Sequence, residues 1–464
     1  MLLGERSDTD ILLIDAGSGT VVTAGDVRVR AEEFCSVSGR GLAFLQCDNS
    51  LGSVRDFVAV LEARIPVALI DSGLDPDLLA GLADRYRPDL LLQGSRPDVR
   101  GVKESAPGAW AVSEPGPESH PDLAVLLTTS GSTGSPKLVR LSWQNLLSNA
   151  RQIVASLGIH PADRGVTALP LFYSFGMSIV TSHLLAGSSV VVTDRGVLDR
   201  QFWEDLSSFQ VTFLPGVPQT FAMLKRLGFL DQGVPSLRAV IQAGGRLAPD
   251  LVAHFSELIC ARGGEFFVMY GQTEAAPRIA CLPPTRLPDK LGSAGVALEG
   301  GRLVAMNEEI ELPPGEVGEI VYSGPNVMMG YAESRGDLAL GDVQGPSLRT
   351  GDLGYLDDEG FLFLTGRSKR IAKLAGSRVS LDEIEAMVPD LGHVAAVDAG
   401  DAGICLFTTV PDPEVVTGAR RQLARRLHVA VKLVAIEYVE ELPLLGNGKV
   451  DYRTLTQLAK GDPE

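Results

Sequence analysis

Between residues 42 and 270, short apolar runs alternate with stretches whose apolar residues recur at helical spacing. The stretch 143–157, for example, places Leu146, Ile153 and Leu157 on one face of a helix. Short apolar runs bounded by glycine, proline or polar residues are typical of buried strands. Because parallel strands are joined by crossover helices, this alternation predicts an α/β architecture with a mostly parallel sheet.

The boundaries of these elements can be placed from the pattern. The expected strands lie at residues 42–46, 66–70, 89–92, 123–128, 166–169, 189–193, 211–214, 239–242 and 266–270. The expected helices lie at residues 54–63, 76–86, 143–157 and 249–260. Ser142 is suited to cap the third helix, and Pro249 suits the first turn of the fourth.

The pattern changes after about residue 300. A strand is expected at 319–323 and a hairpin at 355–364, and the sequence SLDE at 380–383 is a capping box for a helix that runs to Val388. We therefore expect an N-terminal domain of α/β subdomains with a β-rich subdomain, a hinge and a small α+β C-terminal domain, at residues 1–366, 367–370 and 371–464.

Charge and cysteine content restrict the partners and the compartment. The formal net charge of -17 argues against binding to nucleic acid or to anionic membranes. The five cysteines are scattered and never form a CxxC pair, which is typical of reduced thiols in the cytoplasm. The N-terminal segment does not resemble a signal peptide, and no run of about 18 apolar residues exists. We expect a cytoplasmic protein without a membrane span.

A loop of glycine and hydroxyl residues follows the expected strand 123–128. Residues 128–137 read TTSGSTGSPK and end in Lys137. Glycines let backbone N–H groups approach a polyphosphate, hydroxyls add donors, and the lysine adds charge. The loop does not fit GxxxxGK[ST]. Its position between a strand and the helix 143–157 predicts a phosphate-binding loop, and the alternative is a flexible linker.

A second motif, YGQTE, stands at residues 270–274, where an apolar strand ends. In open α/β sheets, ligands bind beyond the carboxyl ends of the strands. Tyr270 could stack on a base, Thr273 could donate to a phosphate, and Glu274 could hold Mg²⁺. Taken alone, these residues are equally compatible with an ordinary polar turn.

Two further loops present single charged groups. RTGD at 349–352 is followed, after the expected hairpin, by Arg367, so an aspartate and an arginine could contact ribose hydroxyls and phosphate. LPLLGNGKVD at 442–451 presents Lys449. Each motif alone is weak evidence for a site, because RTGD is a common surface turn and a lysine on a loop is usually solvated.

In this order and at these separations, the motifs resemble those of the acyl-adenylate-forming superfamily: acyl-CoA synthetases, adenylation domains of nonribosomal peptide synthetases and firefly luciferase. TTSGSTGSPK resembles its phosphate loop, YGQTE its adenine and Mg²⁺ motif, and LRTGDLGYLDDEGFLFLTGRSKR its ribose motif and hinge. KLAGSRVSLDEIE resembles its thioester-step loop, and LPLLGNGKVDYRTL its catalytic-lysine motif. The resemblance covers nearly the whole chain.

The resemblance implies an ATP-binding site. The implied phosphate-loop residues are Thr129, Ser130, Gly131, Ser132, Thr133, Gly134 and Lys137. The implied residues around the adenine are Gly244, Gly245, Tyr270, Gly271 and Gln272. Asp352 is expected to hold the ribose hydroxyls with the help of Arg367, and Thr273 is expected to contact the α-phosphate.

The resemblance also implies how the reaction proceeds. Glu274 is expected to bind Mg²⁺, and Lys449 to bridge the acid carboxylate and the α-phosphate. Attack of a carboxylate on phosphorus brings two anions together, so cations placed there stabilise the transition state. The small C-terminal domain is expected to be mobile, with its pivot at Lys369, and to bring the loop of Gly376 to the pantetheine thiol in the second step.

The segment LPLFYSFGM at 169–177 resembles the acid pocket of the superfamily. Its expected lining residues are Tyr173, Ser174, Phe175 and Gly176. Amino-acid-activating members carry an aspartate here, whereas this segment has no carboxylate. Because an unpaired ammonium is costly to bury, an aliphatic or aryl acid is favoured over an α-amino acid. The alternative is that these are plain core residues.

The expected function is ATP-dependent activation of a small-molecule carboxylic acid, followed by transfer of the acyl group to a thiol. The expected cofactors are ATP, Mg²⁺ and either coenzyme A or an acyl or peptidyl carrier protein with a phosphopantetheine arm. One alternative is an adenylating enzyme that transfers the acyl group to an amine or activates another oxyanion. A second is a non-catalytic nucleotide-binding relative, although Lys137, Glu274, Asp352 and Lys449 are all present.

Overall fold

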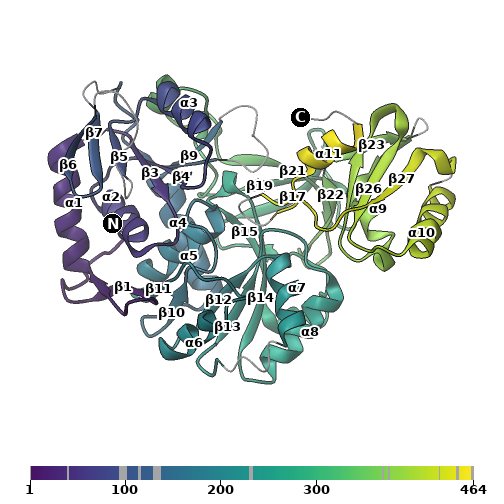
Figure 1. The fold of residues 1–464 in the computed structure, drawn as a ribbon, viewed down its shortest axis with the longest axis horizontal. Coiled ribbons are helices and arrows are strands. Elements are labelled where there is room, and N and C mark those ends of the chain that lie inside the picture. The colour runs from purple at the N-terminus through teal and green to yellow at the C-terminus, as the bar shows by residue number, and fades with distance from the viewer. Residues whose placement is uncertain are drawn as a thin grey trace. The chain divides into compact units, whose positions relative to one another are not determined.

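The structure is a computed structural model of the chain. It describes residues 2–38, 41–92, 102–112, 116–128, 137–228, 234–367, 370–374, 377–427, 429–445 and 449–460. The chain divides into two compact units, made of residues 1–302 with 322–348 and of residues 303–321 with 349–464. Figure 1 shows the elements of both units.

The first unit contains an extended mixed sheet (Figure 1). Its strand order is β20 (Gly330–Ala332), β9 (Leu138–Ser142), β8 (Leu123–Thr128), β4 (Val67–Asp71), β3 (Ala43–Cys47), β5 (Leu90–Leu92), β7 (Ala109–Val112) and β6 (Val102–Ala106). The strands β8, β4, β3 and β5 run parallel, and the flanking strands pair antiparallel. The central strands are apolar and buried, as expected for a parallel sheet between helices.

A second sheet of this unit carries the YGQTE motif. Its order is β12 (Phe213–Gly216), β13 (Ala239–Gln242), β14 (Glu265–Gly271), β15 (Arg278–Leu282) and β16 (Val296–Ala297). The strands β12, β13 and β14 are parallel, and β15 returns antiparallel to β14. A third sheet has the order β10 (Arg164–Val166), β11 (Ser189–Val192), β1 (Ile11–Asp15) and β2 (Val21–Thr23).

Helices connect these strands and cover their faces. They are α1 (Ala24–Ser38), α2 (Leu51–Glu62), α3 (Pro76–Tyr86), α4 (Trp143–Leu157), α5 (Ser174–Leu185), α6 (Arg200–Ser208), α7 (Pro218–Leu227) and α8 (Pro249–Cys260). Ser142 caps α4 as predicted, since its side chain accepts a hydrogen bond from the Asn145 N–H in a capping box. The helices α7 and α8 pack on β12 and β14.

The second unit is built from smaller sheets. Its strands are β18 (Ile310–Glu311), β17 (Arg302–Asn307), β19 (Gly318–Ser323), β21 (Ser347–Leu356) and β22 (Leu362–Arg367) in one sheet, β23 (Ile371–Leu374) and β24 (Ser377–Ser380) in another, and β25 (Val394–Asp398), β26 (Ile404–Thr408) and β27 (Val434–Tyr438) in a third. Its helices are α9 (Leu381–Ala386), α10 (Pro413–Arg426) and α11 (Tyr452–Lys460). The helices α9 and α11 pack on β25, and α10 packs on β27.

The predicted α/β fold class is confirmed, and several predicted elements have the observed bounds, among them α3, α4, α8, β8 and β13. Several expectations were wrong in detail. The helix expected at 54–63 is Leu51–Glu62, and the strand expected at 211–214 is Phe213–Gly216. The strand expected at 166–169 ends at Val166, and the helix expected to reach Val388 ends at Ala386. The loop at 128–137 does not lead directly into a helix, because β9 intervenes and pairs with β8. No helix among the described residues is long and apolar enough to cross a membrane.

Candidate active site

Two candidate adenine-binding segments reach the same edge of the second sheet. In the parallel pairing of β13 and β14, Gln242 lies opposite Val268. Gly244 and Tyr270 each stand two residues further along, so they lie at the same level, Gly244 just after β13 and Tyr270 in the last residues of β14, at the carboxyl ends of these strands. The Gln242 Nε2 donates to the Gly245 carbonyl at 2.7 Å, which fixes the turn after β13.

Glycine is required at two of these positions. Gly244 has a φ of +83°, and a Cβ there would lie 2.6 Å from the Tyr173 hydroxyl oxygen. A Cβ on Gly271 would lie 1.8 Å from the Pro277 carbonyl oxygen. The backbone therefore passes close to its neighbours at both points, and no side chain fits between them.

The last residues of YGQTE form a 3₁₀ turn, Thr273–Ala275. The Thr273 hydroxyl lies 3.3 Å from the hydroxyl of Ser174, the first residue of α5. The Tyr331 hydroxyl donates to Glu274 Oε1 at 2.9 Å. Burial and the adjacent Glu274 carboxylate raise the pKa of Tyr331, so this hydroxyl stays protonated and donates throughout the physiological range.

Lys137 belongs to the same cluster. It precedes β9, and β9 pairs with β20 so that Tyr331 lies opposite Val139. The Lys137 Nζ lies 2.9 Å from Glu333 Oε1 and 5.9 Å from the centre of the Tyr331 ring. The first unit thus brings a cation, a carboxylate and two hydroxyls of the predicted site together, through a tyrosine that the sequence did not single out.

The predicted ribose-binding pair lies in the second unit. Asp352 and Arg367 are opposite residues of β21 and β22, and the Arg367 Nε donates to Asp352 Oδ1 at 2.9 Å. The Asp352 side chain is buried, whereas that of Arg367 is 61% exposed. A buried carboxylate with an exposed guanidinium partner can accept from hydroxyl groups while keeping its charge compensated.

Backbone hydrogen bonds of the second unit hold Lys449. The residues Leu444 and Val450 form an isolated antiparallel bridge, and the Leu445 N–H donates to the Lys449 carbonyl at 2.8 Å. The Asp451 side chain then accepts from the N–H of Arg453 and so helps to start α11. The lysine backbone therefore has a defined position within its unit.

Several predicted site residues lie outside the described residues. They are Thr129, Ser130, Gly131, Ser132, Thr133, Gly134, Lys369 and Gly376. The described predicted residues fall into two sets, one in each unit. Those of the first unit are Lys137, Tyr173, Ser174, Phe175, Gly176, Gly244, Gly245, Tyr270, Gly271, Gln272, Thr273 and Glu274. Those of the second unit are Asp352, Arg367 and Lys449.

The predicted acid-pocket segment forms the start of α5. Phe175 is buried, and a Cβ on Gly176 would lie 2.1 Å from the Pro170 carbonyl oxygen, so the helix start packs tightly on the segment before it. The guanidinium of Arg278 lies 3.8 Å above the centre of the Phe175 ring. Sequence reasoning missed this arginine, and its position four residues after Glu274 was the only available signal.

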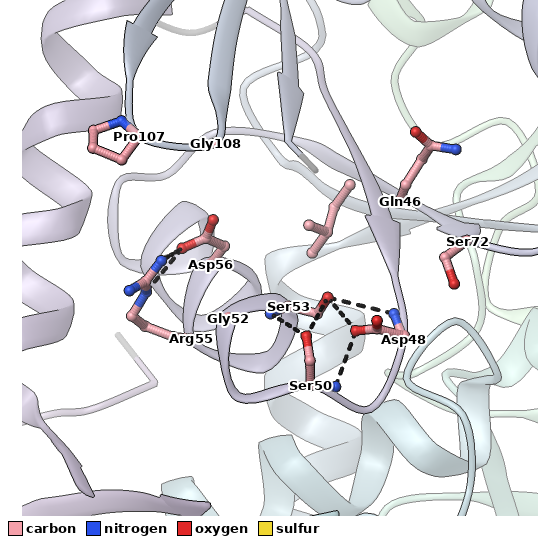
Figure 2. A pocket seen from close by; sticks show the side chains of 11 residues that line it. Gln46, Asp48, Ser50, Gly52, Ser53, Arg55, Asp56, Ser72, Pro107 and Gly108 are labelled. Carbon is pink, nitrogen blue, oxygen red and sulfur yellow. Dashed lines mark hydrogen bonds and ion pairs between the residues drawn. The ribbon is translucent and has the colours of Figure 1, made fainter. Parts of the chain in front are cut away.

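One described cavity, of about 400 Å³, lies elsewhere (Figure 2). It is lined by the start of α2 and by the turn between β6 and β7, and contains none of the predicted site residues. Figure 2 shows that most of its charged and hydroxyl side chains bond to one another: the Ser53 hydroxyl donates to Asp48, and Arg55 to Asp56. With these groups satisfied internally, the cavity gives no indication of a reactive centre.

Among the described residues, no three or more His, Cys, Asp or Glu side chains converge as a metal cage. Magnesium does not require one, because it is commonly held by one or two carboxylates together with substrate phosphates. Glu274, with Tyr331 orienting one carboxylate oxygen, fits that requirement.

Comparison with known proteins agrees with this geometry. The AMP-binding enzyme family matches residues 44–332. The 2-succinylbenzoate–CoA ligase of Bacillus velezensis is 33% identical over 358 residues, which cover 74% of this chain and 70% of that protein. The long-chain-fatty-acid–CoA ligase of Escherichia coli is 31% identical over 398 residues, covering 81% and 69%. The Bacillus subtilis o-succinylbenzoate CoA synthetase, solved with its acyl-adenylate intermediate, superposes with a TM-score of 0.79 at 25% identity, covering 97% of this chain and 96% of that one.

The chain therefore belongs to the AMP-binding enzyme family. The resemblance to acyl-adenylate-forming enzymes and the expected class, an AMP-forming acid–thiol ligase, are confirmed. The expected cofactors ATP, magnesium and coenzyme A are consistent with these relatives, and another structure of the B. subtilis enzyme, 24% identical, is a complex with ATP and magnesium.

Proposed function

We propose that the protein activates an aliphatic or aryl carboxylic acid with ATP, releases pyrophosphate, and transfers the acyl group from the acyl-adenylate to the thiol of coenzyme A. The observation that carries this proposal is the cluster of Lys137, Tyr331 and Glu274 beside Thr273 and Ser174. It combines a cation for phosphate, a carboxylate for Mg²⁺ and hydroxyl donors in one unit.

Lys137 would bind the phosphates of ATP. In the structure it pairs with Glu333, and both side chains are about half exposed. Such pairs contribute at most about 1 kcal/mol, so a polyphosphate can displace the glutamate from the lysine. Thr273 would donate to the α-phosphate, and bound Mg²⁺ would neutralise phosphate charge beside Glu274. Asp352 with Arg367 would hold the ribose, and Lys449 would bridge the acid carboxylate and the α-phosphate.

Replacing Tyr331 with Phe is expected to weaken magnesium binding. The change removes the hydroxyl that donates to Glu274 but keeps the ring. Losing a group that orients a metal ligand typically costs about 10–100-fold in metal affinity, and we expect about 10-fold because Tyr331 is partly exposed. The measurement is the magnesium concentration for half-maximal pyrophosphate exchange. Tyr438→Phe, at an exposed tyrosine of the second unit, is the control. If both variants needed the same magnesium concentration for half-maximal exchange, the assignment of Glu274 as the magnesium ligand would be contradicted.

The named activities of the relatives and the local charge support the proposed acid class. The relatives include ligases for 2-succinylbenzoate, oxalate and long-chain fatty acids. The guanidinium of Arg278 beside Phe175 adds a buried positive charge next to the acid-pocket segment. That charge would repel the ammonium group of an α-amino acid, in agreement with the missing aspartate.

Pyrophosphate exchange tests the proposed function. A panel of aliphatic, aryl and amino acids is incubated with ATP and labelled pyrophosphate, with and without coenzyme A, and the products are analysed by mass. Exchange with one acid class together with acyl-CoA is the expected result. Exchange without acyl-CoA would indicate a carrier protein or an amine as acceptor, and absence of exchange with every acid would overturn the proposal.

We also propose that residues 367–370 form the hinge between an N-terminal domain, 1–366, and a mobile C-terminal domain, 371–464. Lys369→Pro is expected to slow thioester formation at least 10-fold more than adenylation, because proline fixes φ near -65° and restricts the rotation that only the second step requires. Single-turnover rates of the two steps measure this difference. Equal losses in both would place the pivot elsewhere.

A further inference from the structure

Arg278 is a buried cation with an incomplete set of partners. It opens β15 and is only 3% exposed. Across the described part of the chain, no carboxylate pairs with it, and its Nε has no hydrogen-bond partner. Burial lowers the pKa of Arg278 to about 10, so the guanidinium is still charged at neutral pH.

The backbone of Arg278 is fixed by two fully buried amides. The Arg278 N–H donates to Asn149 Oδ1 at 3.1 Å, and the Asn149 Nδ2 donates back to the Arg278 carbonyl at 2.8 Å. The same carbonyl accepts from Asn326 Nδ2 at 2.9 Å. Two buried side chains therefore hold this one residue, and the direction of its side chain is determined by the fold.

The guanidinium is directed to the acid-pocket segment. It lies over the ring of Phe175, which packs against the ring of Tyr173, and the Tyr173 hydroxyl in turn lies close to Gly244. All of these residues belong to the first unit. The positive charge is therefore placed between the start of α5 and the end of β14.

The energetics of this arrangement require a counter-charge. The cost of burying an ion in a protein exceeds what a single cation–π contact returns. Other buried arginines of the unit are satisfied. Arg335 pairs with Asp89 and donates to two carbonyls, and Arg140 donates to several carbonyls. Arg278 differs from both in lacking such partners among the described residues.

We propose that Arg278 binds a second carboxylate of the substrate, so that the acid activated by this enzyme is a dicarboxylic acid. This inference rests on the proposed function. A guanidinium binds a carboxylate through two parallel hydrogen bonds, which would supply both a counter-charge and an acceptor for the unpaired Nε. The carboxylate that is activated is the other one, at the α-phosphate.

Matched pairs of acids test the inference. Each pair consists of an aliphatic or aryl dicarboxylic acid and its half-amide, in which the distal carboxylate is replaced by a neutral group of the same size. We expect the wild-type enzyme to prefer the diacid about 10–100-fold in kcat/KM for pyrophosphate exchange, which is the value of hydrogen bonds to a charged group. The preference is expected to disappear in Arg278→Met and to persist in part in Arg278→Lys.

Stability separates this role from a structural one. Replacing a buried ion without a protein partner by an apolar side chain of similar size is expected to leave the unfolding midpoint equal or higher. Arg335→Met is the matched control. It is expected to lower the unfolding midpoint, whereas its ratio of kcat/KM for the diacid to kcat/KM for the half-amide stays as in the wild type.

The possible outcomes are distinct. Exchange with half-amides as fast as with diacids in the wild-type enzyme would overturn the inference and leave the proposed function intact. An equal loss for diacid and half-amide in Arg278→Met would mean that the arginine serves the activated carboxylate or the fold. No exchange with any acid would instead overturn the proposed function. If Arg278→Met does not fold, Arg278→Lys decides: a preference for diacids as large as in the wild type would overturn the inference.

Discussion

Lys449→Ala is expected to reduce acid-dependent pyrophosphate exchange about 100- to 1,000-fold, the usual cost of removing one group that stabilises transition-state charge. We expect transfer from a supplied acyl-adenylate to coenzyme A to change only a few-fold, because that step no longer joins a carboxylate to a phosphate. The rates of the two half-reactions, measured separately, provide the test.

A loss of folding would not mimic this result. The backbone at Lys449 is held by the bridge between Leu444 and Val450 and by the hydrogen bond from the Leu445 N–H to the Lys449 carbonyl. Truncating the lysine side chain leaves these bonds in place. Lys432→Ala removes the same charge from an exposed position of the same unit and serves as the control. Normal exchange by Lys449→Ala would exclude this lysine as the catalytic residue.

Arg335→Met is expected to destabilise the first unit by about 3–5 kcal/mol, because it leaves the buried Asp89 without its cation. The Arg335 Nη2 lies 2.8 Å from Asp89 Oδ2, and both side chains are 5% exposed. The same carboxylate accepts from the N–H groups of Leu42 and Gly116. One ion pair thus joins the segment after β20 to the start of β5.

Urea denaturation followed by tryptophan fluorescence measures this effect, and the single variant Asp89→Asn together with the double variant Arg335→Met, Asp89→Asn completes the cycle. Because the double variant removes both charges, we expect it to recover part of the loss. If Arg335→Met has the same urea midpoint of unfolding as the wild type, the ion pair contributes no net free energy to stability. If the double variant is as unstable as the sum of the single ones, the two side chains do not interact.

The sequence predicted elements whose signals are local. The helix α4 has an apolar face and a capping serine within one stretch, and its bounds were correct. The strand β9 was missed because Arg140 interrupts its apolar residues. The structure shows why an arginine is tolerated there: it donates to the carbonyls of Met329, Tyr331 and Leu340, about 190–200 residues away. No local pattern records such a partner.

The same limit applies to the site. The motifs identified Lys137 and Glu274, but not Tyr331, which contacts Glu274 across 57 residues. Nor did they identify Arg278, because the local sequence around a single arginine in an apolar strand does not depend on whether an acidic partner lies beside it in the folded protein. Its significance depends on distant neighbours, which only the tertiary structure supplies.

The pairing of β9 with β20 also has a thermodynamic consequence. It joins Lys137, which precedes β9, to Tyr331 in β20 and through that tyrosine to Glu274. A ligand that shifts either strand therefore shifts the surroundings of both charges. Nucleotide and metal would be linked, each altering the apparent dissociation constant of the other by the same factor. The dissociation constant measured in a titration with nucleotide alone, or with metal alone, would then depend on the concentration of the other ligand.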